Sequence, residues 1–259
     1  MNNILPVILS AGMGTRLGNE NKNQPKALLE ISGKCLISYQ LEKLRNIGFS
    51  EVLIVVGFKE ASIKKILGDD LQGMTLHYVT NEDFSQTGTA YSFYKSQGFW
   101  SQNKPSILML HSDIFYDLSL LDAVLLKPRK SVLVIDESYV NNTNDEMVVF
   151  AHNQNVYKIE KGPSEMQDAV GEVLGINLFS SSFCDSYFAF LESFFENNKN
   201  KKVHWEQTLK IFLENSSKSY LGYLEINQKL WVNINYSADL EYAKSFMYRS
   251  MYNYQPKKK

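Results

Sequence analysis

The chain is poor in the residues that mark several specialised classes of protein. It has two cysteines, Cys35 and Cys184, which lie far apart and have no CxxC or metal-type spacing. We therefore expect no disulfide framework and no cysteine-bound metal, and we expect both thiols to be reduced in a cytoplasmic protein. No apolar run approaches the ~20 residues that span a bilayer. No signal peptide is visible because the apolar N-terminal run is short, so we expect a soluble protein without a membrane partner.

Charge and composition exclude further classes. The formal net charge of -1 gives no global field that could hold nucleic acid. The four histidines have no metal-ligand spacing, and no Ser/His or Cys/His pair is arranged as a nucleophile with its base. A hydrophobic content of 44% in 259 residues can form a sizeable core. Without repeats or low-complexity linkers, we expect a single domain over residues 1–259.

The first half of the chain alternates between apolar runs and helical patterns. We expect strands at 4–9, 52–57, 76–79 and 106–113 and helices at 36–47, 59–67 and 88–97. Further strands are predicted at 132–135, 147–150, 156–159, 174–179 and 220–225, and helices at 183–196, at 205–213 and from 238 onward. We interpret the later strands as an extension of the sheet with an antiparallel ribbon. The predicted fold class is α/β, a Rossmann-like mixed sheet with helices on both faces.

A glycine loop follows the first strand directly. The sequence Leu9-Ser10-Ala11-Gly12-Met13-Gly14-Thr15-Arg16-Leu17 is followed, after seven residues, by Pro25-Lys26-Ala27-Leu28. Glycine lets an anion approach the main chain closely, and successive N–H groups form an anion-binding concavity. Arg16 and Lys26 add positive charge. We interpret the loop as a triphosphate pocket, with a purely structural turn as the alternative. It is neither a Walker loop nor a complete dinucleotide fingerprint.

The complete string closely resembles the signature of the nucleotidyltransferase superfamily, L-x-A-G-x-G-T-R-L followed by P-K-x-L. These enzymes join a nucleoside triphosphate to a phosphorylated sugar or alcohol. The resemblance implies the fold of nucleotide-diphospho-sugar transferases, with a nucleotide-binding half at 1–130 and an acceptor-binding half at 131–259. It implies two catalytic residues, Arg16 on the β,γ-phosphates and Lys26 at the α-phosphoryl group. In this region it implies nucleotide contacts by Leu9, Ala11, Gly12, Met13, Gly14, Thr15, Arg16 and Lys26.

The resemblance also implies a Mg²⁺ cofactor. Asp113 stands where the superfamily has an aspartate that holds Mg²⁺ on the triphosphate, although a lone aspartate after a strand can also be a cap or turn residue. The segment from Trp231 to Glu241 resembles the late motif W-x-E-I-D-x-x-x-D-L-E, but asparagines occupy both acidic positions. An amide oxygen can ligate a hard cation without adding charge. We take Asn235 as the second ligand and Asn233 as the alternative, against a purely structural helix cap.

Residues 80–92 carry the implied base-binding segment. Gly88-Thr89-Ala90 resembles the G-T-A of sugar nucleotidyltransferases, whereas Asn81, with Phe84, Tyr91 and Ser92, has the spacing found in bacterial phosphocholine cytidylyltransferases. We take Asn81, Gly88 and Thr89 as nucleotide-binding residues. The segment favours a pyrimidine nucleotide, with CTP preferred and UTP or dTTP left open.

The acceptor half contains a second set of candidates. Residues 144–149 and 203–206 resemble stretches of cytidylyltransferases that act on phosphocholine-like alcohols. A quaternary ammonium group favours aromatic faces and carboxylates, so we expect Glu146, Trp205 and Glu206 in the acceptor site. Core packing is the alternative for Trp205. Lys161 resembles a lysine that contacts the acceptor phosphate in sugar-phosphate enzymes, and a solvated strand-end lysine is the alternative.

Taken together, the resemblance implies transfer of a cytidylyl group from CTP to a small phospho-alcohol such as phosphocholine, with release of pyrophosphate. One alternative is a sugar-1-phosphate uridylyl- or thymidylyltransferase that supplies a cell-surface polysaccharide. Another is an inactive relative that binds a nucleotide as a sensor, suggested by Asn235. A Rossmann-type oxidoreductase is disfavoured by the glycine pattern and by the absence of an acidic residue after Val55-Val56-Gly57. The sequence leaves the oligomeric state open.

Overall fold

The computed structural model describes most of the chain. It covers residues 3–14, 24–126, 131–137, 146–162, 168–197, 200–215, 220–226 and 231–253, the last stretch as backbone alone beyond residue 245. Over these ranges, none of the helices combines the length and the apolar character that a membrane span requires.

Four parallel strands form the centre of the sheet. They are β1 (Ile4–Ser10), β4 (Glu51–Val56), β6 (Met74–Thr80) and β7 (Ser106–His111). β1 lies in the middle and pairs in parallel with β4 and with β7, and β4 pairs in parallel with β6. Burial of both faces explains the continuous hydrophobic runs of β1, β4 and β7, whereas β6 is only partly buried.

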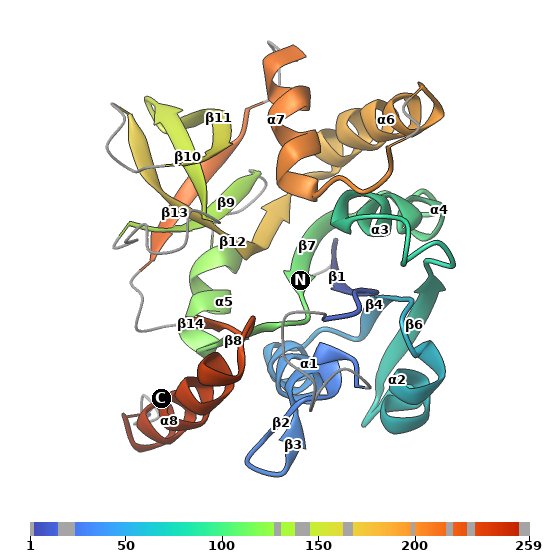
Figure 1. The fold of residues 1–259 in the computed structure, drawn as a ribbon, viewed down its shortest axis with the longest axis vertical. Coiled ribbons are helices and arrows are strands. Elements are labelled where there is room, and N and C mark those ends of the chain that lie inside the picture. Colours follow the sequence, from blue (N-terminus) through green and yellow to red (C-terminus); the bar gives the residue numbers. More distant parts are fainter. Residues whose placement is uncertain are drawn as a thin grey trace.

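Helices cover both faces of this centre (Figure 1). Leu5, Val7 and Leu9 of β1 pack on the side of α3 (Thr89–Lys95), α4 (Gln97–Trp100), α6 (Ser181–Asn197) and α7 (Trp205–Asn215). Ile8 packs on the opposite side with α1 (Leu36–Ile47), α2 (Glu60–Leu67) and α5 (Leu118–Leu125). The predicted helices at 36–47, 59–67, 183–196 and 205–213 are thus confirmed. Helix α5 was not predicted from the sequence.

The second half adds strands that run mainly antiparallel. They are β9 (Val132–Asp136), β10 (Met147–His152), β11 (Asn155–Lys161), β12 (Ala169–Phe179) and β13 (Gly222–Ile226). The long strand β12 joins them to the core, because its C-terminal part pairs with β7 and its N-terminal part pairs with β10. β9 pairs with β12 along the opposite edge of that strand. The structure confirms the predicted fold class and the ribbon formed by β10 and β11.

Short elements complete the molecule. The 3₁₀ turn η2 (Lys26–Leu28) precedes a hairpin of β2 (Glu30–Ile31) and β3 (Lys34–Cys35), and β5 (Asp70–Leu71) lies at the sheet edge. The strand predicted at 106–113 ends at His111, and Asp113 lies in the turn before β8 (Ile114–Tyr116). β8 pairs with β14 (Trp231–Asn233), which leads into α8 (Ser237–Asn253).

Candidate active site

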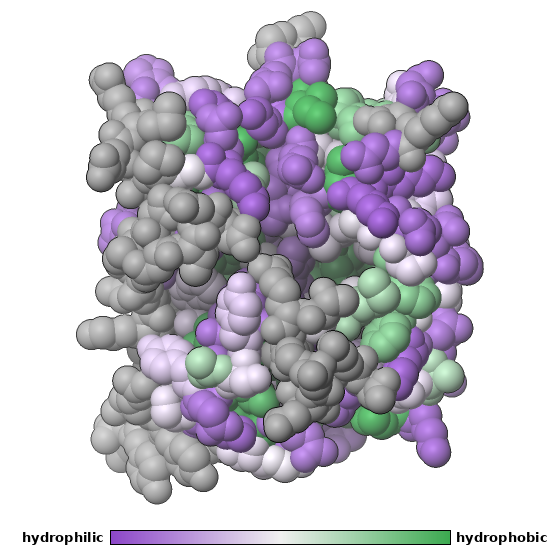
Figure 2. Space-filling view, viewed as in Figure 1, coloured by the Kyte–Doolittle hydropathy of each residue, from purple (hydrophilic) through white to green (hydrophobic). Residues whose placement is uncertain are grey.

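A cleft of about 1300 Å³ opens where the sheet divides. It lies between the carboxyl ends of β1 and β7 on one side and β11, β12 and α7 on the other. Figure 2 shows a hollow near the middle of this face, with hydrophilic side chains around it. In open α/β sheets, ligands bind beyond the carboxyl ends of the strands.

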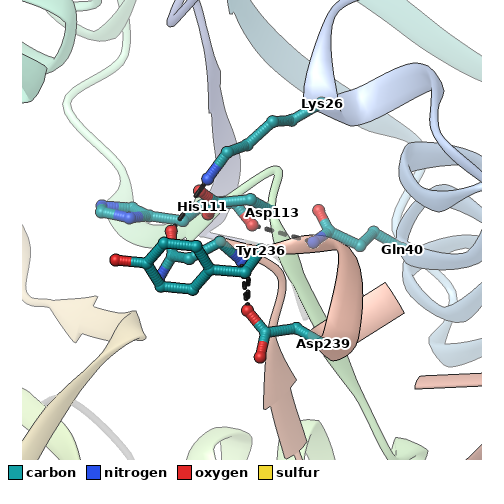
Figure 3. A network of polar contacts seen from close by, with 7 residues as sticks. Lys26, Gln40, His111, Asp113, Tyr236 and Asp239 are labelled. Carbon is teal, nitrogen blue, oxygen red and sulfur yellow. Dashed lines mark hydrogen bonds and ion pairs between the residues drawn. The ribbon is translucent and has the colours of Figure 1, made fainter. Parts of the chain in front are cut away.

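Lys26 links two distant segments within this cleft. Its Nζ donates to Oδ2 of Asp113 at 3.0 Å and to Oδ1 of Asn235 at 2.9 Å (Figure 3). The Lys26 side chain is 12% exposed and that of Asp113 is 25% exposed, so the contact is shielded but still faces the cleft. Two oxygen atoms therefore converge on one cation.

The register of β8 and β14 brings Asn235 to this point. Asn233 stands opposite Ile114, and the Ile234 amide donates to the Asp113 carbonyl at 2.9 Å. Asp239 then fixes the next turn, since its Oδ2 accepts from the backbone amides of Asn235 at 2.8 Å and Tyr236 at 2.7 Å. An aspartate in the first turn of α8 also suits the positive end of the helix dipole. The backbone around Asn235 is thus held by the Asp113 carbonyl on one side and by the Asp239 carboxylate on the other.

The surroundings keep Asp113 ionised. Burial by itself raises the pKa of Asp113, but the charges of Lys26 and His111 and the hydrogen bond from Lys26 lower that pKa below its usual range. The site therefore offers a carboxylate, and not a carboxylic acid, at neutral pH.

The donor set at this point is suited to Mg²⁺. Asp113 and Asn235 both present an oxygen to a single position now taken by an ammonium group. In the part of the chain that the structure describes, no group of three or more His, Cys, Asp or Glu side chains could hold a metal. Mg²⁺ is usually bound by one or two protein oxygens, substrate phosphates and water. The residues therefore fit an ion that a triphosphate helps to hold.

The glycine loop forms the adjoining wall. Leu9, Gly12 and Gly14 line the cleft. Gly14 has φ +62°, a conformation that glycine adopts without strain. Ala11 is buried and its carbonyl accepts from the Phe58 amide at 3.1 Å, so its contribution is to hold the loop. Met13 is exposed but is not part of the lining, and the predicted residues Thr15 and Arg16 lie outside the described residues.

The base-segment candidates have different positions. Thr89 lines the cleft, and its Oγ1 accepts from the Trp205 amide at 3.0 Å. Asn81 is buried away from the cleft and donates to Oγ atoms of Thr87 and Ser92. A Cβ at Gly88 would lie 2.1 Å from the Val203 carbonyl oxygen, so glycine is needed for close packing there. In the structure Asn81 and Gly88 thus hold the segment together, and neither is part of the cleft lining, so their contact with the nucleotide stays a prediction.

Three of the four acceptor candidates line the cleft. They are Glu146, Lys161 and Glu206. Trp205 is 1% exposed and packs in the core, with its ring edge-on to His111 at 6.1 Å. Trp205 is therefore not part of the cleft lining, which favours the core-packing alternative, and its contact with the acceptor stays a prediction. Successive residues of a helix point about 100° apart, so Glu206 can face the cleft while Trp205 faces the core.

Three glutamates from the second half of the chain, Glu146, Glu172 and Glu206, line the cleft. Burial, together with Glu146 and Asp136, raises the pKa of Glu172 to about 7. Burial also raises the pKa of Glu206 to about 7, against the opposing effect of Lys161. Glu172 was missed by the sequence reasoning, because it lies in a strand without a recognisable motif.

Other residues of the site were also missed. Gln40, Trp231 and Asp239 hold or line this region. Trp231 and Asp239 belong to the late motif, which could have indicated them. Gln40 gives no sequence signal beyond its place on the apolar side of α1.

Comparison with known proteins decides the family. The family model for nucleotidyl transferases matches residues 5–240, which covers the glycine loop, Lys26, Asp113 and Asn235. The chain belongs to the nucleotidyl transferase family. The predicted resemblance is thereby confirmed.

A curated relative of this nucleotidyl transferase extends over nearly the whole chain. It is CTP:phosphoglutamine cytidylyltransferase of Campylobacter jejuni, 22% identical over 252 residues, which cover 91% of this chain and 97% of the relative.

Solved structures show the same fold. CTP:phosphocholine cytidylyltransferase of Streptococcus pneumoniae has a TM-score of 0.68 at 20% identity and covers 95% of this chain and 99% of its own. A glucose-1-phosphate thymidylyltransferase of Bacillus anthracis, described as putative in its name, has a TM-score of 0.74 at 18% identity, with 98% of both chains covered. The Rossmann-like fold of nucleotidyltransferases is thus common to relatives with different substrates.

Proposed function

We propose that the protein transfers a cytidylyl group from CTP to the phosphate of a small phosphorylated acceptor such as phosphocholine, and releases pyrophosphate. The observation that carries the proposal is the cleft that Lys26, Asp113 and Asn235 share with a group of carboxylates. Family membership supports the nucleotidyl transfer. The cytidylyl relative supports the choice of CTP.

The proposed reaction is a displacement at phosphorus. An ionised oxygen of the acceptor phosphate forms a bond to the α-phosphorus of CTP, and the bond from that phosphorus to the bridging oxygen of the β-phosphate breaks. The electron pair leaves with pyrophosphate. Because the attacking oxygen is already ionised at neutral pH, no general base is required, and catalysis consists of positioning and charge stabilisation.

In this proposal Lys26 neutralises charge that develops at the α-phosphoryl group, and Arg16 holds the leaving phosphates, as the family resemblance implies. Asp113 and Asn235 would hold Mg²⁺, which when bound supplies charge neutralisation at the phosphate oxygens. The contact of Lys26 with both oxygens keeps its ammonium beside this place before the substrates bind. Lys161, which lines the opposite wall, would contact the acceptor phosphate.

The carboxylates favour an acceptor that also carries a positive charge. Glu146, Glu172 and Glu206 line the cleft, and the raised pKa values of the last two show that burial disfavours their ionised forms. An ammonium group would stabilise those ionised forms. Trp231, which also lines the cleft, offers an aromatic surface in place of Trp205.

The test is a pyrophosphate-release screen that crosses CTP, UTP, dTTP, GTP and ATP with phospho-alcohols and sugar 1-phosphates. We expect the highest rate with CTP and a cationic phospho-alcohol. Phosphocholine should exceed 3,3-dimethylbutyl phosphate, which has the same shape without the charge. The Lys26→Ala protein serves as the control for contaminating activity.

Two results would change the assignment. Preference for UTP or dTTP with a sugar 1-phosphate would overturn the choice of substrates in favour of a sugar nucleotidyltransferase. Absence of Mg²⁺-dependent pyrophosphate release with every pair would favour an inactive relative that binds a nucleotide.

A further inference from the structure

Gln40 spans the turn that carries Asp113. It projects from α1, is 1% exposed, and donates from Nε2 to the carbonyl oxygen of His111 at 2.8 Å (Figure 3). The same Nε2 donates to the carbonyl oxygen of Ile114 at 2.7 Å. These two carbonyls lie on either side of Asp113 in the chain. One side-chain amide thus closes the turn between β7 and β8.

The orientation of the amide follows from its partners. A flipped side chain would direct Oε1 at two carbonyl oxygens, and an oxygen has no hydrogen to donate to them. With Nε2 toward the turn, Oε1 of Gln40 is buried and has no hydrogen-bond partner among the described residues. Burial of an unmatched polar atom costs about 1–3 kcal/mol. An apolar side chain of similar size would fill this space without that cost.

We propose that Gln40 is a positioning residue that fixes the Asp113 carboxylate at the place where it meets Lys26. The inference rests on the proposed function, because it gives Asp113 a part in charge stabilisation at the phosphates. The carbonyls of His111 and Ile114, which flank Asp113, are both bound by Gln40, and the Asp113 carboxylate contacts Lys26. Loss of the amide therefore frees the turn without removing any group that faces the cleft.

Three variants separate the hydrogen bonds of Gln40 from other effects of substitution in α1. Gln40→Met keeps the length of the side chain and removes both donated hydrogen bonds. Gln40→Glu keeps the shape and places carboxylate oxygens against the carbonyls, and it is the second variant if the first does not fold. Tyr39→Phe is the control, because it removes a hydrogen bond of 2.7 Å from the same helix to the Ile31 carbonyl, away from Asp113.

The first measurement is structural and needs no substrate. In crystal structures, we expect the Asp113 carboxylate of Gln40→Met to move away from Lys26 by on the order of 1 Å, a displacement large enough to impair a site that requires tight geometry. Tyr39→Phe should leave Asp113 in place. An unchanged Asp113 in Gln40→Met, or an equal shift in Tyr39→Phe, would overturn the inference.

The second measurement is calorimetric titration with CTP in the presence and absence of Mg²⁺. Loss of a group that supports a metal ligand typically weakens metal affinity or activity about 10- to 100-fold. We expect Gln40→Met to lose about tenfold of the Mg²⁺-dependent gain in CTP affinity, while its Mg²⁺-free affinity and that of Tyr39→Phe stay unchanged. In turnover, kcat should fall and the KM of the acceptor should hold.

Different results would overturn the positioning role of Gln40 and the proposed function. A full Mg²⁺-dependent gain in Gln40→Met would overturn the positioning role. If Asp113 moves as expected but the wild-type protein does not bind CTP with or without Mg²⁺, the positioning is supported and the proposed function is overturned.

Discussion

Glu172 gives the protein a pH dependence of stability that can be predicted in sign and size. It lies on β12, where the register places it opposite Asp136 of β9 and opposite Val148 of β10. Its pKa is raised from 4.5 to about 7 by burial and by the charges of Glu146 and Asp136. The substitution Glu172→Gln keeps the shape and removes the ionisation.

The sign follows from proton binding. Between pH 4.5 and about 7 the folded protein retains a proton on Glu172 that the unfolded chain has released. The contribution of Glu172 to stability is therefore highest below pH 4.5, the pKa of an unperturbed glutamate. It is lost as the pH rises through about 7, the pKa of Glu172 in the folded protein. A shift of one pKa unit corresponds to about 1.4 kcal/mol, so the ionised carboxylate lowers the free energy of unfolding at pH 8 by about 3 kcal/mol.

Glu172→Gln should remove this loss of stability at high pH, because glutamine does not ionise. We expect the variant and the wild type to differ little at pH 5, and the variant to be more stable at pH 8 by about 2–3 kcal/mol. For a chain of this size that difference corresponds to a rise in Tm of about 5–10 °C. Urea unfolding at both pH values measures it directly.

The control is Glu214→Gln, which changes an exposed glutamate on α7. It should not alter the pH dependence. If Glu172→Gln changes stability by the same amount at pH 5 and at pH 8, the reasoning from the carboxylate cluster is refuted, and the substitution acts through packing alone.

Other substitutions test the site and the base segment. Lys26→Ala or Asp113→Ala should reduce pyrophosphate release by several powers of ten while the circular dichroism spectrum stays native, and near-normal turnover in both would contradict the assignment. Gly88→Ala should destabilise the protein by about 1–3 kcal/mol, because the new Cβ would lie 2.1 Å from the Val203 carbonyl oxygen. Gly98→Ala is its control, since nothing lies within 4 Å of a Cβ there, and equal Tm values for the two variants would argue against the clash.

Local sequence patterns predicted most of the elements. Runs such as 52–56 are apolar at every position because both faces of a parallel strand are covered, and that signal is independent of the rest of the chain. The helix at 36–47 is likewise set by spacing and by its terminal glycine. The short strands β8 and β14 gave no such signal, because three residues are too few to show a period.

Two adjacent residues on α7 show how far the sequence alone could predict the site. Trp205 and Glu206 were both assigned to the acceptor, yet the first packs in the core and the second lines the cleft. The pattern of α7 does distinguish them, since Thr208, Leu209 and Phe212 are buried with Trp205. The chemical attraction of a tryptophan for an ammonium group obscured this amphipathic pattern.

The sequence by itself determined the family signature and the order of strands and helices in the core, and it predicted Lys26 and Asp113 as site residues, because each depends on a short motif or on local periodicity. Only the tertiary structure decided that Asn235 meets Lys26 across 209 residues, that Gln40 holds the Asp113 turn, and that Glu172 joins Glu146 and Asp136. Those contacts depend on which strands pair and in which register, and pairing between distant segments leaves no period in the chain.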